Sequence, residues 1–317
     1  MLRNSYEKSL ICFKFAILHY NLAKYYQGIR IKMILLDGKA LSLKIKDELK
    51  NMSLTLKTKG VEPCLAVILV GNDAASQSYV NAKAKACEVC EIKSLVYKLD
   101  FNTTQNELLA LINTLNYDDS VHGILVQLPL PPHINKNVIL ESILSSKDVD
   151  GFHPINVGYL NLGIESGFLP CTPLGVMKLL KAYEIDLEGL DTVVIGASNI
   201  VGRPMATMLL NAGASVSICH IKTKDLSFYT QKADLIIVAA GCVNLLKEDM
   251  VKEGVIVVDV GINRIDNHLV GDVDFDKVSK KASFISPVPG GVGPMTIAML
   301  LENTIKSAKN RLLNPQI

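Results

Sequence analysis

The chain has 317 residues, which at about 100–200 residues per domain is room for two domains, each with its own core. Hydrophobic residues make up 49% of it and charged residues 20%, a balance too apolar and too weakly charged for a disordered chain. The formal net charge of +2 gives no overall field that would attract a polyanion. We therefore expect a folded protein that does not bind nucleic acid.

Cysteine usage and hydropathy indicate the compartment. Seven cysteines, scattered from Cys12 to Cys242, cannot form a complete set of disulfides, which is typical of a reducing environment. Cys87 and Cys90 form a Cys-x-x-Cys pair, but no second pair or nearby His completes a zinc site, so two reduced cysteines on a helix are favoured. No run reaches the about 18 apolar residues of a membrane-spanning helix. These patterns predict a cytoplasmic protein without a membrane partner.

From Met33 onward, apolar runs of strand length alternate with helical patterns, as in parallel sheets built from βαβ crossovers. Thr104 and Glu107 form a capping box at the start of one helix. The last strand of this half runs into a proline-rich loop at Pro129, and ligands collect at the carboxyl ends of such strands. The first half is predicted to contain strands at Cys64 to Val70, Ile92 to Leu99 and Val121 to Leu128, and helices at Gln77 to Glu91 and Asn106 to Asn116.

The second half repeats this alternation after Pro170. Its fold class is therefore also α/β, and we predict a Rossmann-like, doubly wound parallel sheet. The glycine- and proline-rich segment from Pro287 to Pro294 is expected to be a loop of defined backbone shape. The predicted elements are helices at Leu174 to Tyr183 and Met295 to about Leu312, and strands at Thr192 to Gly196, Ser215 to His220, Leu235 to Ala239 and Val255 to Val260.

A strand passes through a glycine-containing turn into a helix between Val193 and Pro204. Glycines there would let the backbone approach a pyrophosphate, and the helix N-terminus would offer free N–H donors. The turn contains Gly196, Ala197, Ser198, Ile200, Gly202 and Arg203. Its spacing is Gly-x-Ser-x-x-x-Gly rather than Gly-x-Gly-x-x-Gly, so an ordinary strand-to-helix turn is the alternative.

The residues after the next predicted strand bear on the choice of cofactor. A carboxylate there would bind the ribose hydroxyl of NAD, whereas a cation accommodates the 2′-phosphate of NADP. The segment from His220 to Lys224 contains Lys222 and no acid, and Arg203 could face the same pocket. We therefore predict NADP rather than NAD, with solvated loop lysines as the alternative.

Tyr79 and Lys83 stand four residues apart on a predicted helix, so the hydroxyl and the amine share one face. A surface tyrosine beside a solvated lysine is the simple interpretation. The functional one is an amine desolvated by its neighbours, which could exchange protons near neutral pH. Gln127, at a strand end, could hold that amine through its amide oxygen, or be an ordinary buried amide.

Three further polar residues stand in one loop. Asp148 and Asp150 are candidate acceptors, although aspartates are also common in turns. His153, taken alone, is more often structural than catalytic.

Together these segments resemble the bifunctional methylenetetrahydrofolate dehydrogenase/cyclohydrolase family. The resemblance spans Met33 to the C-terminus; residues 1–32 match nothing in the family, so we expect an appendage there and Met33 as the true start. The segments that carry the resemblance, in the family's order, are Ser76 to Lys83, Gly123 to Pro131, Lys147 to Gly158, Gly196 to Pro204 and Pro287 to Thr296.

The resemblance implies NADP-dependent oxidation of 5,10-methylenetetrahydrofolate to the methenyl form, followed by hydrolysis to 10-formyltetrahydrofolate, in one cleft between two domains. Lys83 would be the catalytic lysine, Tyr79 would pack on the folate rings, Gln127 would tune the lysine and Asp150 would bind the pterin. A carboxylate suits a pterin edge because it can accept two N–H groups at once. The family's loop at Pro289, Gly290 and Gly291 would border the substrate.

The resemblance also implies that Thr172 and Ile262 lie near the cofactor and that the protein is a homodimer. We predict no metal site. Ile221 departs from the serine that many NADP-using members carry, so relaxed cofactor preference stays open. The implied domains are residues 33–170 for catalysis, completed by the C-terminal helix 296–317, and residues 171–295 for NADP binding.

Other function classes fit less well. Short-chain dehydrogenases also use Tyr-x-x-x-Lys, but their glycine turn precedes that pair, whereas Gly196 follows Lys83. A serine hydrolase built on Ser198 lacks the Gly-x-Ser-x-Gly elbow. A non-catalytic nucleotide sensor would bind NADP without turnover.

Overall fold

The structure is a computed structural model that describes residues 33–266 and 268–313. The appendage predicted at residues 1–32 lies outside these residues. Ile34 begins one compact unit. In the described part of the chain no helix is both long enough and apolar enough to cross a bilayer.

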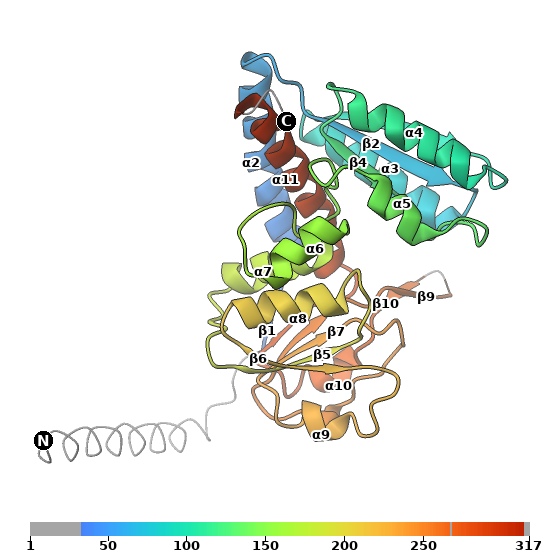
Figure 1. The fold of residues 1–317 in the computed structure, drawn as a ribbon. Helices are drawn as coiled ribbons and strands as arrows, with labels where there is room; N and C mark the ends of the chain where they lie inside the picture. The colour runs from blue at the N-terminus through green and yellow to red at the C-terminus, as the bar shows by residue number, and fades with distance from the viewer. Residues whose placement is uncertain (1–32, 267, 314–317) are drawn as a thin grey trace, which may run out of the picture. The chain divides into compact units, whose positions relative to one another are not determined.

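A three-stranded parallel sheet forms the centre of the first half, with β2 between β3 and β4 (Figure 1). All of β2 is buried, because its alternate side chains enter two different hydrophobic clusters. Leu65 and Val67 pack with helices α2, α3 and α11. Ala66 and Ile68 pack with α4 and α5 on the other face. The strands are β2 (Cys64–Val70), β3 (Lys93–Leu99) and β4 (Gly123–Val126).

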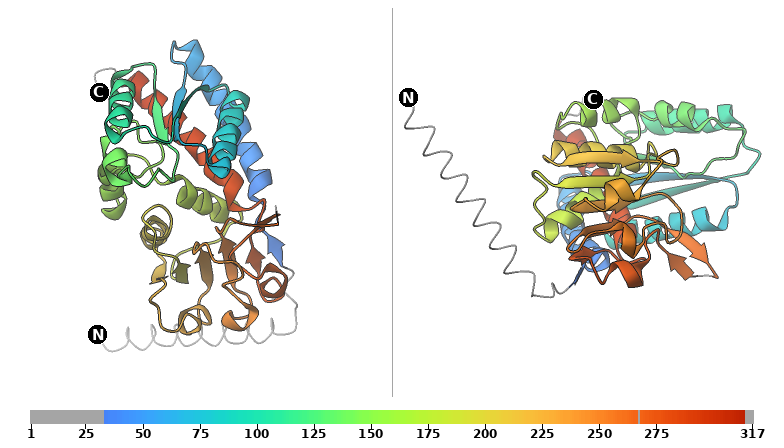
Figure 2. Two further views of the ribbon diagram at one scale, coloured as in Figure 1. Left: turned by 90° about the vertical axis from the view of Figure 1, so that its right-hand side faces the viewer. Right: turned by 90° about the horizontal axis from the view of Figure 1, so that it is seen from below.

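The covering helices come from both ends of the chain. The C-terminal helix α11 runs beside α2, as Figures 1 and 2 show, and contributes Met299 and Leu301 to the same cluster as Leu65. These helices are α2 (Gly38–Thr58), α3 (Ala74–Val89), α4 (Gln105–Tyr117), α5 (Lys136–Ser142) and α11 (Val292–Leu313).

A six-stranded parallel sheet forms the second half, in the order β1-β11-β8-β7-β5-β6. The strand order reverses at β5, which has β6 on one side and β7 on the other. Ligands of open α/β sheets bind at the carboxyl edge of such a switch point. The strands are β1 (Ile34–Leu35), β5 (Asp191–Ile195), β6 (Ser215–Cys219), β7 (Leu235–Val238), β8 (Ile256–Asp259) and β11 (Phe284–Ile285).

One face of this sheet is covered by α7 and α8, whose Leu179 and Met205 pack with Val194 and Ile237 of the strands. An antiparallel hairpin of β9 and β10 follows β8. The remaining elements are α6 (Pro154–Asn161), α7 (Cys171–Ala182), α8 (Gly202–Asn211), α9 (Ser227–Thr230), η1 (Glu248–Met250), β9 (Asn263–Ile265), β10 (His268–Val270) and α10 (Phe275–Val278).

The predicted α/β class and the doubly wound second sheet are confirmed. The strand predicted at Val121 to Leu128 is shorter: it is β4, because Val121 closes a turn onto the Asp118 carbonyl and Pro129 has no N–H for a ladder. The helix predicted from Gln77 begins earlier, since Asp73 accepts a hydrogen bond from the Ser76 N–H at 2.7 Å and caps α3.

The elements that were not predicted include the short strands β1, β9, β10 and β11 and the long helix α2. β1 and β11 have two residues each, too few for any hydropathy period. Helix α2 begins directly after β1, where the Asp37 side chain accepts from the Ala40 N–H. Because β1 pairs with β11, the first residues after Met33 belong to the second sheet.

Candidate active site

A cavity of about 330 Å³ lies where the carboxyl ends of β4 and β8 meet the starts of α7 and α11. Both halves of the unit contribute to its wall. Seven of the predicted site residues line it together: Tyr79, Lys83, Gln127, Asp150, Thr172, Ile200 and Ile262.

Lys83 and Gln127 are in direct contact in this wall. Lys83 lies on α3, one turn after Tyr79, and its Nζ donates to Gln127 Oε1 at 3.0 Å. The Gln127 amide is oriented in turn, because its Nε2 donates to the Leu128 carbonyl at 2.7 Å. That bond assigns Oε1 to the lysine, so the amide can only accept from it. The lysine amine is thus held at one position, half-buried at the carboxyl end of β4.

Asp150 stands close to this amine. Burial raises the pKa of the Asp150 carboxyl, and the positive charge of Lys83 acts in the opposite direction. The Cys171 thiol lies between the carboxyl and the Val149 carbonyl, to which its Sγ donates at 3.3 Å. Asn303 of α11 donates to the same carbonyl at 2.8 Å, which fixes the loop that carries Asp150. A carboxyl and an amine therefore share one wall without forming a direct ion pair.

The alternative acceptor, Asp148, has a different place. It is buried and does not line the cavity; its Oδ2 accepts from the His153 N–H at 2.7 Å and from Asn156 Nδ2 at 2.9 Å. His153 caps α6, because its Nδ1 accepts from the Ile155 N–H at 3.1 Å. Both side chains hold the loop that presents Asp150.

The predicted glycine turn lies at the carboxyl end of β5, the switch point of the second sheet. Gly196 has φ +115°, and a Cβ there would stand 2.1 Å from the Ala239 carbonyl oxygen. A Cβ on Gly202 would stand 2.0 Å from the Gly196 oxygen, so only glycine allows this close approach of strand and helix.

The same turn exposes backbone donors. The N–H groups of Ala197, Ser198 and Ile200 donate to no described residue, and α8 starts without a side-chain cap. Ser198 Oγ instead accepts from the Val201 N–H at 3.2 Å, the bond of a turn residue rather than of an activated nucleophile. Free N–H groups next to a helix N-terminus suit a pyrophosphate. The residues present therefore fit a dinucleotide.

The other predicted cofactor residues lie outside the cavity wall. Arg203 is exposed on the first turn of α8, and its Nε donates to the Ala197 carbonyl at 3.2 Å. Lys222 is exposed in the turn after β6, where its N–H donates to His220 Nδ1 at 3.1 Å. Ile221 beside it is fully exposed.

The loop at Pro289, Gly290 and Gly291 also lies outside the cavity wall but leads directly into it. Gly290 has φ +109° and its carbonyl accepts from the Lys39 N–H of α2 at 2.8 Å. Directly after Gly291 the same segment lines the cavity with Val292 and Gly293.

The sequence did not predict that a second hydroxyl, that of Thr296, lies next to Thr172 in the wall. Thr172 of α7 and Thr296 of α11 lie 3.0 Å apart, Oγ1 to Oγ1, and both line the cavity. Thr296 ends one of the segments that carry the family resemblance, so the motif pointed to it. Their contact joins residues 124 positions apart, which no local pattern encodes.

A doubly wound sheet with a glycine turn at its switch point, beside a half-buried lysine–glutamine pair, defines a nucleotide-dependent α/β enzyme. Comparison with known proteins identifies the family. The chain matches the catalytic domain of tetrahydrofolate dehydrogenase/cyclohydrolase over residues 36–150 and the NAD(P)-binding domain of the same family over residues 170–312. It belongs to the tetrahydrofolate dehydrogenase/cyclohydrolase family.

Individual relatives support the same family assignment. The chain is 82% identical over 281 residues to the bifunctional protein FolD of Campylobacter jejuni, covering 88% of this chain and all of that one. The crystal structure of the bifunctional enzyme FolD from C. jejuni has a TM-score of 0.87 and 81% identity, with 88% and 99% of the two chains covered. The FolD of Trypanosoma brucei, solved with NADP and an inhibitor, has a TM-score of 0.84 and 38% identity, with 88% and 98% covered.

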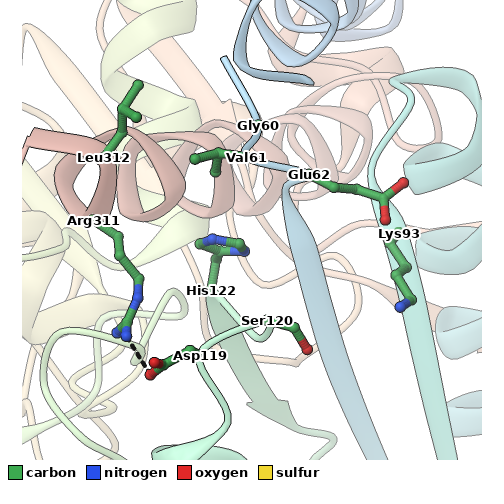
Figure 3. Close-up of a pocket in the computed structure, with 9 residues that line it drawn as sticks. All are labelled: Gly60, Val61, Glu62, Lys93, Asp119, Ser120, His122, Arg311 and Leu312. Atoms are coloured by element: carbon green, nitrogen blue, oxygen red, sulfur yellow. Dashed lines mark ion pairs between the residues drawn. The ribbon is translucent and has the colours of Figure 1, made fainter. Parts of the chain in front are cut away.

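A second cavity, of about 280 Å³, lies at the opposite, amino edge of the three-stranded sheet (Figure 3). An Arg311–Asp119 ion pair lies on one side of His122, and Glu62 and Lys93 lie on the other. The two acidic and two basic side chains that line this cavity balance each other in charge. None of the lining residues belongs to the segments that carry the family resemblance. His122 is 6% exposed, and its Nδ1 has no hydrogen-bond partner among the residues that the structure describes.

We predict that His122 makes stability depend on pH. Burial, then the charges of Lys147 and Arg311, lower the pKa of His122 to about 4, against about 6.5 when unfolded. Between these values the unfolded chain binds a proton that the folded chain does not, so the free energy of unfolding falls as the pH is lowered through this window. The full effect is on the order of 3 kcal/mol.

Denaturant unfolding of the wild type and of His122→Gln at several pH values between 7 and 4 checks this. The wild type should lose more stability than the variant. The comparison between variants is needed because Asp259, whose burial raises its pKa to about 6, contributes with the opposite sign in the same range. Parallel curves for the two proteins would contradict the prediction.

Proposed function

We propose that this chain oxidises 5,10-methylenetetrahydrofolate to the methenyl form with NADP and then hydrolyses that form to 10-formyltetrahydrofolate. The observation that carries the proposal is the Lys83–Gln127 pair, held at 3.0 Å in one cavity with Asp150, in a chain of this family. Both steps use the same bound folate, so one cavity serves them.

The two halves of the unit have separate tasks. NADP, when bound, supplies the acceptor for the hydride that leaves the bridging carbon. The backbone of the Gly196–Gly202 turn holds the pyrophosphate through its free N–H groups. Ile200 and Ile262 give the cavity an apolar wall that excludes water from the reacting carbon during hydride loss.

Asp150 and Tyr79 hold the folate. The Asp150 carboxylate accepts two N–H groups from one edge of the pterin, a paired contact that also fixes orientation. Tyr79, 40% exposed, covers the ring system, and the loop at Pro289 borders the substrate. Thr172, at the start of α7, is assigned to the part of the cavity that holds the cofactor. The bridging carbon is thereby placed next to the lysine amine.

Lys83 acts in the hydrolytic step. Hydride loss leaves a cation shared by the two nitrogens that flank the bridging carbon, and this nearby positive charge favours the neutral amine of Lys83. The amine takes a proton from water as the water oxygen bonds to that carbon. The carbon–N5 bond then breaks as the lysine ammonium gives this proton to N5. The proton that remains on the added oxygen is released to solvent, which leaves a formyl group on N10. Gln127 keeps Lys83 Nζ in position during these steps through its hydrogen bond to the amine.

Lys83→Met is expected to lower the hydrolysis of methenyltetrahydrofolate by at least about 100-fold, because the general base is lost. Binding of NADP, at the other side of the cavity, should be unchanged. Lys85→Met, which removes an exposed lysine of the same helix, is the matched control and should keep full activity. Unchanged hydrolysis by Lys83→Met, followed by the absorbance of the methenyl form, would remove Lys83 from the mechanism.

Cofactor preference follows from the turn after β6. Lys222 is exposed there, no acid is present, and Arg203 stands on α8, so the 2′-phosphate of NADP meets positive charge. Ile221 offers no hydroxyl to it. We expect kcat/KM to favour NADP over NAD, and Lys222→Ala to lower the NADP value by about ten-fold through a lost charge-assisted bond. The NAD value of the same variant is the control, and an equal loss with both cofactors would contradict the prediction.

We assign two domains: residues 33–170 with the C-terminal segment 296–317 for catalysis, except that β1 pairs into the second sheet, and residues 171–295 for NADP. α11 supports this division, since it packs in the core of the first sheet. A reducing, cytoplasmic location fits the free thiols of the six described cysteines, Cys87 and Cys90 among them. Nucleic acid and membranes are not proposed as partners.

Two copies of the chain are expected to form a homodimer. β3 is an edge strand that pairs only with β2, and Val96 on it is 37% exposed. Such an edge offers unpaired backbone groups to a second chain. Sedimentation analysis should give a mass near twice 34.6 kDa. The mass of a single chain at micromolar concentration would contradict the expectation.

A further inference from the structure

The β9–β10 hairpin places an arginine near the active-site cavity. Ile262, the residue before β9, lines the cavity. Side chains alternate between the two faces of a strand, so Arg264 shares the face of Ile262, and its cross-strand partner Leu269 lies on that face too. Arg264 is therefore directed to the same side of the hairpin as the cavity wall.

The other face of the hairpin is anchored. Asn263 Nδ2 donates to Asp272 Oδ1 at 2.8 Å. The second oxygen of Asp272 accepts from the N–H groups of Ala240 and Gly241, at 2.7 and 2.8 Å, just beyond the carboxyl end of β7. One carboxylate thus ties the start of the hairpin to the second sheet, which sets the direction of its opposite face.

The charge of Arg264 acts on Tyr79, and its guanidinium has no counter-ion among the described residues. Its charge lowers the pKa of Tyr79, against the larger effect of burial, so the guanidinium acts on the hydroxyl that borders the cavity. Arg264 is exposed, and its side chain makes no hydrogen bond or ion pair to another described residue. Lys83 and Asp150 are the charged residues in the described wall itself. A cation therefore stands outside this wall, on the face of the hairpin that it shares with Ile262.

If the proposed function holds, the substrate carries negative charge at the end opposite to the one that Asp150 binds. A tetrahydrofolate has its pterin at one end, a p-aminobenzoyl group after the bridging carbon, and a glutamyl tail with carboxylates at the other end. With the pterin on Asp150 and the bridging carbon at Lys83, the p-aminobenzoyl group extends past Tyr79. We propose that Arg264 binds a carboxylate of the glutamyl tail and so determines the preference of the site for folates that carry this tail.

The expected effect is on binding and not on chemistry. An exposed ion pair is modest and screened by salt, so its loss should weaken folate binding by about three- to ten-fold. Arg264 is remote from the reacting carbon, so it binds substrate and transition state alike, and its removal raises KM without changing kcat.

The experiment measures the affinity for tetrahydrofolate and for tetrahydropteroate, which lacks the glutamyl group, by calorimetry on the full chain. Wild type should prefer tetrahydrofolate by about three- to ten-fold, and this preference should disappear in Arg264→Gln. Arg264→Lys should keep part of it. Lys280→Gln, which removes an exposed charge outside the cavity wall, is the matched control and should behave like the wild type.

Three results would overturn the proposal: an unchanged preference in Arg264→Gln, equal affinity of the wild type for both compounds, or a weakened affinity for NADP with folate binding intact. Steady-state assays on the same proteins separate this proposal from the proposed function. Absence of turnover of 5,10-methylenetetrahydrofolate by the wild type would overturn the function, whereas the calorimetric preference would still decide the role of Arg264.

Discussion

The hydrogen bond from Lys83 to Gln127 joins the two structural elements on which the catalytic wall depends. Lys83 is placed by helix α3, whose start is capped by Asp73, and Gln127 by the end of β4 in a fully buried sheet. Because the amide is itself held by the Leu128 carbonyl, the amine can take only one position. A general base must stand within hydrogen-bonding reach of the water that it activates, so in the proposed mechanism this bond sets the position of the base.

A second constraint acts from the other sheet. Gly202 lets the start of α8 approach the Gly196 carbonyl at the end of β5, and Gly196 lies equally close to the Ala239 carbonyl after β7, so neither position has room for a Cβ. That approach leaves backbone N–H groups free at the switch point, and free donors are what a pyrophosphate needs. The two constraints face one cavity, so hydride transfer and hydrolysis can act on the same bound carbon.

Buried carboxylates organise the loops between these two constraints. Asp148 holds the loop that presents Asp150, and Asp272 holds the turn after β7 together with the β9–β10 hairpin. Each accepts several N–H groups, which compensates for the cost of burying its charge. The hairpin that Asp272 anchors carries Ile262 into the cavity wall and Arg264 to the same side.

The sequence by itself determined what depends on neighbouring residues: the α/β alternation, the shared helix face of Tyr79 and Lys83, and the glycine turn at a strand end. It left the strand ends imprecise, and it did not predict β1 and β11, because two residues carry no period. Only the tertiary structure decided that Thr172 meets Thr296, that β1 pairs with β11, and that the charge of Arg264 acts on Tyr79. Those contacts join distant parts of the chain, and they exist because strand order and helix packing bring such parts together, which no local pattern of residues specifies.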